Sequence, residues 1–344
     1  MSRFREEIGK QPEVVSALLD ESRDAVAAIG ARIREMAPRG FVIAARGSSD
    51  HAALYAKYLF GARNRALVAL AAPSLFTHYR QAPRLEGQCV IGISQSGASP
   101  DVVAVLEEAR RQGALTLAIT NDAESKLAQV AELLLTLGVG SEHSVPASKT
   151  FTASLVALAL ISNAIDPDPA FASALDRIPE AMTHAIEKEP ELERLVEPLM
   201  GSRAIVLGRG FNFSTAEEIA LKLTETSYIL ARAWSVADFE HGPIAVVETG
   251  FPILMVNGGG PVAGDLESLA RRLEAMGCSV VQLVEGPAVA EDRFMTVRID
   301  SALPEALTPT TLTVLGQLLA HRLAVARGID PDRPRVLRKI TRTW

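Results

Sequence analysis

Four apolar runs in this chain, two in each half, lead into loops rich in glycine, serine or asparagine. Arg46 lies just after the first run, and Arg209 lies just after its counterpart, 163 residues later. Ser94 and Asn257, which follow the second run of each half, are also 163 residues apart. Two such junctions repeated at one spacing indicate two copies of one folding unit, since the spacing is too long for a solenoid of small repeats.

Both halves alternate short, nearly continuous apolar runs with longer helical segments. Apolar strands separated by helices are typical of a parallel sheet that is covered on both faces. We therefore predict an α/β fold of two tandem units, each a parallel sheet with helices on both faces in three αβα layers. The predicted strands are 41–45, 67–71, 89–93, 115–120 and 133–137 in the first unit, and 204–207, 252–256, 280–284 and 294–299 in the second.

The same pattern divides the chain into five parts. We expect N-terminal helices over 1–34, the first unit over 35–166, a charged helical connector over 167–200, the second unit over 201–328, and a tail over 329–344 that folds over the site. The first unit should close with a long helix at 149–165, and the second with a helix at 304–327.

Composition and charge narrow the classes of partner. The chain is 48% hydrophobic and 22% charged, which allows a sizeable buried core. Its net charge of −6 argues against a nucleic-acid partner. The longest apolar stretch, 151–165, contains four polar residues and is too short and polar to cross a membrane.

The two cysteines, Cys89 and Cys278, lie at the edges of apolar runs, so we expect both to be buried and reduced. The N-terminus lacks the apolar core of a signal peptide. These features predict a cytoplasmic protein. The histidines, cysteines and acids show no metal-ligand spacing, so we expect neither a metal nor another cofactor.

Two polar loops are candidates for binding an anion. In a parallel α/β sheet, ligands lie beyond the carboxyl ends of the strands, where Gly47-Ser48-Ser49 and the loop 94–99 are predicted to lie. Their five serine hydroxyls, the Gln95 amide and the backbone N–H groups of a helix start suit a phosphate group. Neither loop contains lysine or a P-loop motif, so a nucleoside triphosphate is not expected. The alternative is a pair of polar turns with a helix cap.

A second candidate lies between residues 217 and 243. Glu218, Lys222 and Glu225 have helical i,i+4 and i,i+3 spacing, and Ile219, Leu223, Ile229 and Leu230 can share an apolar stripe beside them. His241-Gly242-Pro243 should then form a tight loop. A carboxylate, an amine and an imidazole so close together could carry acid–base chemistry. The alternative is a surface helix with structural ion pairs and a histidine that only packs.

Two further segments could border the same site. The segment 140–149 opens a helix, although it could equally be a capped helix start with His143 in solvent. The tail between 330 and 339 is basic and contains two prolines, although it could be a solvated or disordered end.

Taken together, these motifs resemble the sugar isomerase (SIS) domain family. The resemblance rests on Ser94-Gln95-Ser96-Gly97, on the Gly47-Ser48-Ser49 loop and on the duplicated unit. Three further motifs resemble the isomerase half of glucosamine-6-phosphate synthase. They are A-L-K-L-T-E at 220–225, E-H-G-P at 240–243, and the tail pattern from Asp332 through Pro334-Arg335 and Leu337 to Lys339. The similarity runs from about residue 35 to the end. The motifs at 94–97, 220–225, 240–243 and 332–339 lie at four separated places in the right order.

The resemblance implies a role for each matching residue. Glu225 would move a proton between C1 and C2 with help from Lys222, while Glu218 would orient the cluster. His241 would open the sugar ring, contributed by the partner subunit of a homodimer. Lys339 would form a Schiff base with the open-chain ketose, and we expect the surrounding tail arginines to favour its neutral amine. Positions that would bind the sugar phosphate are Gly47, Ser48, Ser49, Ser94, Gln95, Ser96 and Ser99, with Val145 bordering the sugar.

Two departures from the synthase sharpen the functional expectation. The sequence begins Met1-Ser2-Arg3 without the synthase's glutaminase domain, so we expect that glutamine does not supply ammonia. The first loop, 46–50, reads R-G-S-S-D rather than C-G-T-S, and looks more like single-chain members that deaminate amino-sugar phosphates. The resemblance therefore implies a phosphosugar isomerase acting on an amino-sugar 6-phosphate, foremost a glucosamine-6-phosphate deaminase.

Other functions stay open at this point. An aldose–ketose isomerase without nitrogen chemistry and a deglycase for glycated amine 6-phosphates belong to the same enzyme class. A non-catalytic sugar-phosphate sensor belongs to another class. A sensor of that kind would be expected to lack Glu225, His241 or Lys339, and all three are present.

Overall fold

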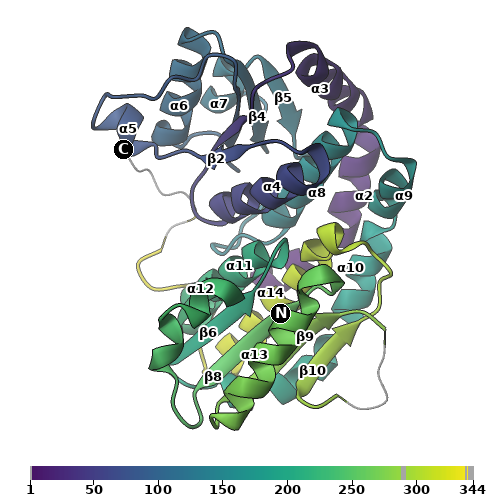
Figure 1. Ribbon diagram of the computed structural model, residues 1–344, viewed down its shortest axis with the longest axis vertical. Coiled ribbons are helices and arrows are strands. Elements are labelled where there is room, and N and C mark those ends of the chain that lie inside the picture. Colours follow the sequence, from purple (N-terminus) through teal and green to yellow (C-terminus); the bar gives the residue numbers. More distant parts are fainter. Residues whose placement is uncertain (1, 288–291, 338, 340–344) are drawn as a thin grey trace. The chain divides into compact units, whose positions relative to one another are not determined.

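The computed structural model describes residues 2–287, 292–337 and 339, which fall into two compact units. The first-sheet unit contains residues 13–142 and 149–176, together with Lys339. The second-sheet unit contains residues 2–12, 143–148, 177–287 and 292–337. Each unit holds one five-stranded sheet with its own helices (Figure 1).

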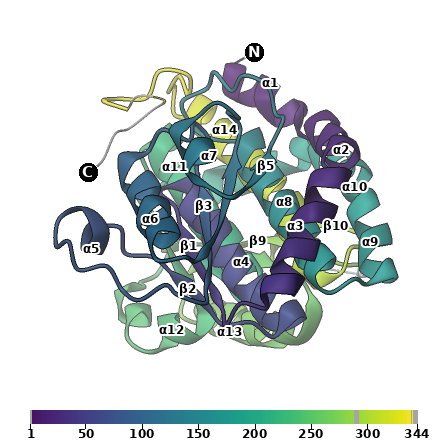
Figure 2. The same ribbon diagram turned by 90° about the horizontal axis from the view of Figure 1, so that it is seen from above.

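The first sheet is parallel throughout, with the strand order β2-β1-β3-β4-β5. Strands β3 and β4 are buried at every position because helices cover both faces of the sheet. Helices α4 and α8 pack together on one face with α3 beside α8, and α6 lies on the other face with α5 and α7 (Figure 2). The strands are β1 (Phe41–Ala44), β2 (Val68–Leu70), β3 (Cys89–Ile93), β4 (Leu115–Thr120) and β5 (Leu133–Thr136); the helices are α2 (Gln11–Glu21), α3 (Arg23–Met36), α4 (Ser48–Asn64), α5 (Ser74–Thr77), α6 (Pro100–Arg111), α7 (Lys126–Val130), α8 (Lys149–Ile165) and α9 (Pro169–Asp176).

The second sheet is also parallel, with the order β10-β9-β8-β6-β7. Helices α11 and α14 pack together on one face, and α12 and α13 lie on the other. The strands are β6 (Arg203–Gly208), β7 (Leu230–Ser235), β8 (Pro252–Asn257), β9 (Ser279–Glu285) and β10 (Met295–Ile299); the helices are α1 (Arg3–Gly9), α10 (Ile178–Glu187), α11 (Asn212–Ser227), α12 (Val236–Glu240), α13 (Ala263–Ala275) and α14 (Pro309–Ala326), with short 3-10 turns η1 (Glu189–Leu195), η2 (Glu197–Leu199), η3 (Pro243–Val246), η4 (Gly260–Val262) and η5 (Glu305–Leu307).

The two sheets share one topology. In each, the second strand of the copy lies at an edge beside the first, and the third, fourth and fifth strands follow on the other side. The structure thus confirms the predicted α/β fold of two three-layer units. All the predicted strands overlap observed strands, and the predicted helix at 149–165 has the bounds of α8.

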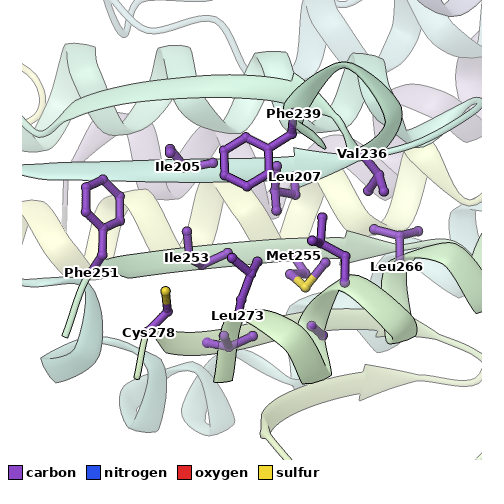
Figure 3. Packing of buried hydrophobic residues seen from close by; sticks show 13 residues of the cluster. Ile205, Leu207, Val236, Phe239, Phe251, Ile253, Met255, Leu266, Leu273 and Cys278 are labelled. Carbon is purple, nitrogen blue, oxygen red and sulfur yellow. The ribbon is translucent and has the colours of Figure 1, made fainter. Parts of the chain in front are cut away.

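The apolar core of the second-sheet unit explains how a short helix is held on the sheet. Side chains of β6 and β8 face those of α12 and α13 across one layer (Figure 3). Val236 and Phe239 of α12 are fully buried there. Because α12 is only five residues long, this packing rather than helix propensity fixes the segment that leads to His241. The other members drawn are Ile205, Leu207, Phe251, Ile253, Met255, Leu266, Leu269, Ala270, Leu273, Cys278 and Val280.

Strand β7 was not predicted, and the predicted apolar stripe is wrong beyond Ser227. Helix α11 ends there because Tyr228 adopts a left-handed conformation with φ of 53°, and the N–H of Ile229 bonds back to the carbonyl of Leu223. Leu230 then begins β7 and is 76% exposed. The strand reads Leu-Ala-Arg-Ala-Trp-Ser, so Arg232 interrupts the continuous apolar run that marks strands such as β3 and β8.

The ends of the chain also differ in detail from the prediction. Three helices, α1 to α3, occupy residues 3–36, where one or two were predicted. The last helix begins at Pro309 rather than at residue 304, because residues 305–307 form a 3-10 turn.

Both cysteines are buried free thiols, as predicted. Burial raises the pKa of Cys89 to about 12 and also raises the pKa of Cys278. Among the residues that the structure describes, no helix has the length and apolar character needed to span a bilayer.

Gly316 allows α14 to approach α11 closely. A Cβ atom at this position would lie 2.2 Å from Cγ1 and 2.4 Å from Cδ1 of Ile219. We predict that Gly316→Ala lowers the free energy of unfolding by about 1–3 kcal/mol, since overpacking outweighs the helix preference of alanine. Urea unfolding measures this change.

Gly264 provides the matched control, because a Cβ atom there, in α13, would meet nothing within 4 Å. Gly264→Ala should leave stability unchanged or slightly raised. A Gly316→Ala protein as stable as the Gly264→Ala protein would contradict the close packing of α11 on α14.

Candidate active site

The serine loops of the first-sheet unit lie at the point where the strand order reverses. Strands β1 and β3 are neighbours, and their following helices, α4 and α6, lie on opposite faces of the sheet. Loops diverge there and leave a crevice that ligands of open α/β sheets occupy. Gly47-Ser48-Ser49 follows β1, and the loop 94–99 follows β3, so both predicted anion loops lie at this reversal point.

The loop after β3 has a fixed conformation. Ser94 Oγ lies 3.3 Å from Ser99 Oγ, and the N–H of Ala98 donates to Ser96 Oγ at 3.3 Å. Gly97 has a φ of 58°, and a Cβ atom there would lie 2.1 Å from Ser125 Oγ, so only glycine fits. Ser99 occupies the N-cap position of α6, followed by Pro100 as predicted. The loop therefore presents hydroxyls at a helix N-terminus, where an anion is favoured.

The loop after β1 leads directly into the next helix. Gly47 has a φ of 57°, and a Cβ atom there would meet nothing within 4 Å. Ser48 and Ser49 form the first positions of α4 and are half-buried. A second helix N-terminus with hydroxyl groups thus lies at the same reversal point.

The second-sheet unit contains a buried cluster of Glu218, Lys222 and Glu225 on α11. The ammonium of Lys222 lies 2.5 Å from Glu225 Oε2 and 3.4 Å from Glu218 Oε1. The side chains of Lys222 and Glu218 are 1% and 0% exposed, whereas that of Glu225 is 22% exposed. The interpretation of this segment as an ordinary surface helix is therefore wrong.

The charges in this cluster depend on one another. Burial is the largest influence on the pKa of Lys222 and lowers it, but the charges of Glu218 and Glu225 act in the opposite direction and leave the pKa above its ordinary value. Lys222 is thus a buried cation held between two carboxylates. Glu225, the most exposed of the three, is the member that can reach a ligand.

His241 lies in a different part of the same unit. It follows α12, and its N–H donates to the carbonyl of Asp238. The imidazole is exposed, and Gly242, with a φ of 136°, turns the chain into η3. The predicted tight loop at 241–243 is therefore present.

The loop that carries Val145 is held by a carboxylate that the sequence did not single out. Glu7 Oε1 accepts the N–H of His143 at 2.6 Å, and Glu7 Oε2 accepts the N–H and the hydroxyl of Ser144 at 3.2 and 2.6 Å. Glu7 lies in α1 and is 5% exposed. It therefore fixes the half-buried Val145 from a position more than 130 residues away in sequence.

A second unforeseen carboxylate belongs to the first-sheet unit. Glu142 accepts hydrogen bonds from the N–H and hydroxyl of Thr150 at 3.1 and 2.8 Å. Its Oε2 also lies 2.7 Å from Lys339 Nζ, and the Glu142 side chain is fully buried. The expectation that the tail arginines favour the neutral amine of Lys339 stays a prediction; the contact that the structure gives Lys339 is the Glu142 carboxylate.

The tail is anchored before it reaches Lys339. Asp332 accepts the N–H groups of Arg3 and Phe4 at 2.7 and 3.0 Å, which caps α1. The N–H of Arg335 donates to the hydroxyl of Tyr228 at 2.8 Å, and its guanidinium lies 4.5 Å from the ring centre. Arg338 and Arg342, which the prediction for Lys339 used, lie outside the described residues.

The predicted residues therefore form separate groups. Glu218, Lys222 and Glu225 contact one another, and Ser94 contacts Ser99. Glu7 and Glu142 were missed because their partners are distant in sequence or belong to a loop, where no periodicity marks them. Within the described part of the chain, no group of three His, Cys, Asp or Glu side chains could hold a metal ion.

Comparisons with known proteins agree with this architecture. The model of the SIS domain family matches residues 38–164 and again residues 201–327, so the two matches begin 163 residues apart, from 38 to 201. A glutamine–fructose-6-phosphate aminotransferase [isomerizing] from Thermococcus kodakarensis is 32% identical over 343 residues, which cover 97% of this chain and 56% of that protein. The chain thus spans about half the length of the curated relatives that it matches.

Solved structures give the same result. A candidate phosphosugar isomerase from Silicibacter pomeroyi DSS-3 has a TM-score of 0.86 and 34% identity, with 96% of this chain and 100% of that chain covered. The C-terminal domain of glucosamine-fructose-6-phosphate aminotransferase from Francisella tularensis has a TM-score of 0.88 and 27% identity, with 97% and 98% covered. Glucosamine-6-phosphate deaminase from Thermotoga maritima, at 22% identity and a TM-score of 0.78 over 99% and 100% of the chains, shares the fold.

We predict that Glu7→Gln destabilises the protein by about 1.5–3 kcal/mol, because an amide group replaces a charged acceptor that faces three donors. Chemical unfolding measures the loss, and limited proteolysis should cut the loop 143–148 faster. Glu6→Gln, exposed on the same helix, is the control and should change stability by less than about 0.5 kcal/mol. Equal effects of the two substitutions would show that Glu7 does not hold the loop.

Proposed function

The chain belongs to the SIS domain family, and we propose that it is a phosphosugar isomerase that deaminates an amino-sugar 6-phosphate, foremost glucosamine 6-phosphate. The observation that carries this proposal is the buried cluster in which Lys222 lies between Glu218 and the partly exposed Glu225. Such a cluster supplies a carboxylate that can act as a base in a water-poor setting. The named activities of the relatives, which isomerise or deaminate hexose 6-phosphates, support the substrate class.

The proposed reaction moves one proton between adjacent carbons. Glu225 takes the proton from C2 of the open-chain amino sugar and returns it to C1. One proton passes from the nitrogen to O1, so the C1 aldehyde becomes an alcohol and the C2 amine becomes an imine. Water then replaces the nitrogen, and the products are the ketose 6-phosphate and ammonia.

Lys222 and Glu218 support this proton transfer. The ammonium of Lys222 pairs with the Glu225 carboxylate and can stabilise the developing oxyanion of the enediol-like intermediate. Glu218, fully buried on the preceding turn, fixes the amine of Lys222. We assign Glu225 as the base, Lys222 as its assistant and Glu218 as the orienting residue.

The serine loops are the proposed phosphate site. Ser94, Ser96 and Ser99 would hold the phosphate with the N-terminus of α6, and Gly47, Ser48, Ser49 and Gln95 would complete the cradle, with Val145 bordering the sugar. Hydroxyl and backbone N–H donors at helix starts suit a phosphate dianion. The fixed conformation at Gly97 supports a preformed loop.

We further propose a homodimer in which His241 serves the site of the partner subunit and opens the sugar ring. Its exposure supports this role, because a side chain that acts on another subunit must reach the surface. Buried free thiols are compatible with the reducing cytoplasm, which we propose as the compartment.

Lys339 is the proposed Schiff-base lysine. In the structure its amine is paired with Glu142, so it must leave this carboxylate, and lose a proton, before it attacks C2 of the imine. Ammonia leaves as the Schiff base forms, and water then hydrolyses the Schiff base to the ketose and the free lysine. The tail would then close over the bound sugar and exclude water, as the proposed five-part organisation with a last part over 329–344 requires.

The direct test is an ammonia-release assay over a panel of hexosamine 6-phosphates. We predict release of ammonia and fructose 6-phosphate from glucosamine 6-phosphate, none from unphosphorylated glucosamine, and no glutamate from glutamine. Cyanoborohydride added with fructose 6-phosphate should attach the sugar to wild-type protein but not to Lys339→Arg. Ketose formation from an aldose 6-phosphate without ammonia release from any amino sugar would replace deamination with plain isomerisation.

Glu225→Gln tests the base. We predict a fall in turnover of about 10²–10⁴-fold and no incorporation of solvent deuterium at C1 of the ketose product or at C2 of the recovered amino sugar, because no carboxylate remains to carry the proton. Glu217→Gln on the same helix is the control and should retain exchange. Exchange by Glu225→Gln at the wild-type rate would mean that another residue is the base.

The same variant tests the shared site. Glu225→Gln mixed with His241→Ala should regain part of the activity in hybrid dimers, since one of the two sites then has both residues intact. Mixed dimers without any recovered activity would place His241 in the site of its own subunit.

A further inference from the structure

One ion pair of the first-sheet unit joins the two serine loops. Arg46, the residue before Gly47, donates from Nε to Asp101 Oδ2 at 2.6 Å. Asp101 is the second residue of α6 and follows Ser99 by two positions. The Asp101 side chain is fully buried, whereas that of Arg46 is 49% exposed. The guanidinium therefore spans from the end of β1 to the helix start that follows β3.

The charge of Asp101 would oppose a phosphate at this place. The carboxylate lies in the first turn of α6, whose N–H groups and dipole attract an anion. A buried negative charge there repels a phosphate dianion and interacts strongly because little water screens it. The positive charge of Arg46 cancels it, and neither serine loop contains a lysine that could do so.

The helix start after β1 has the same feature. Asp50 lies in the first turn of α4. Burial raises the pKa of Asp50, and the positive charges of His51 and Arg46 act in the opposite direction without cancelling that rise. Both helices that begin at the serine loops thus carry an aspartate in the first turn, and Arg46 acts on both.

The second-sheet unit contains the equivalent ion pair at a place without serine loops, so the two copies can be compared. Arg209, 163 residues after Arg46, lies 3.0 Å from Asp265 in the first turn of α13. Here the carboxylate is 53% exposed, and the adjoining loops contain Phe211 and three glycines instead of serines. The ion pair is therefore common to both copies, but the aspartate is buried only in the copy with the serine loops.

We propose that Arg46 is a positioning residue of the phosphate site. It cancels the buried charge of Asp101, so that the N-terminus of α6 is available to the phosphate. This proposal rests on the proposed function, because it requires the phosphate to bind at these loops.

The test compares four variants by kcat and KM for glucosamine 6-phosphate and by competitive inhibition with inorganic phosphate. Arg46→Gln should raise KM and the phosphate inhibition constant by about 10- to 100-fold, the size of one charged interaction, with little change in kcat. Arg46→Lys keeps the positive charge, so KM and the phosphate inhibition constant should stay within about 3-fold of the wild-type values. A change of that size corresponds to about a third of the free energy of one charged interaction. Arg209→Gln, the matched control in the other copy, should leave both constants unchanged.

The double variant Arg46→Gln/Asp101→Asn separates charge compensation from other roles. It removes both charges, so both constants should return to within about 5-fold of wild type, since no uncompensated carboxylate remains. If Arg46→Gln alone does not fold, the double variant still tests the proposal, because it contains no buried unpaired charge. Constants as high as in Arg46→Gln would mean that Arg46 contacts the phosphate directly, and would overturn the proposal.

Other outcomes are equally clear. An equal effect of Arg209→Gln, or an unchanged KM in folded Arg46→Gln, would reduce the pair to a structural brace and would also overturn the proposal. A wild-type protein that does not prefer glucosamine 6-phosphate to glucosamine would instead contradict the proposed function itself.

Discussion

The rest of this cluster depends on the ion pairs that the buried ammonium of Lys222 makes with Glu218 and Glu225. A lysine removed from water is unstable unless opposite charges surround it, and Glu218 and Glu225 supply them from the adjacent turns of α11. This arrangement requires α11 to be covered, and α14 covers it so closely that Gly316 has no room for a side chain against Ile219. The position of one carboxylate at the protein surface is thus set by helix packing.

Duplication followed by divergence accounts for how the two units differ. Both sheets have one strand order, so both have a reversal point at which loops can hold a ligand. The first copy keeps serines at that point, whereas the second has Asn257 followed by glycines. The second copy instead carries the buried cluster of Glu218, Lys222 and Glu225 inside α11. Two copies with one architecture but different residues in their loops are expected, because function resides in particular sites rather than in the fold.

Buried carboxylates organise loops within each of the two units. Glu7 fixes the loop of Val145, Glu142 holds Lys339 and the start of α8, and Asp101 ties α6 to the end of β1. Each accepts hydrogen bonds from groups that a loop would otherwise leave unpaired. A loop held by a charged acceptor has little freedom, which suits a site that must meet its ligand in one geometry.

The sequence by itself determined the fold class and the chemistry that is local in the chain. Continuous apolar strands between helices predicted two parallel sheets, and the spacing of Glu218, Lys222 and Glu225 placed them on one helix face, because both patterns follow from backbone periodicity. Only the tertiary structure decided that this face is buried, that β7 follows α11, and that Glu7 and Glu142 hold loops. Burial depends on what packs against a residue, Arg232 interrupts the apolar run of β7, and hydrogen bonds between residues more than 130 positions apart leave no periodic trace in the sequence.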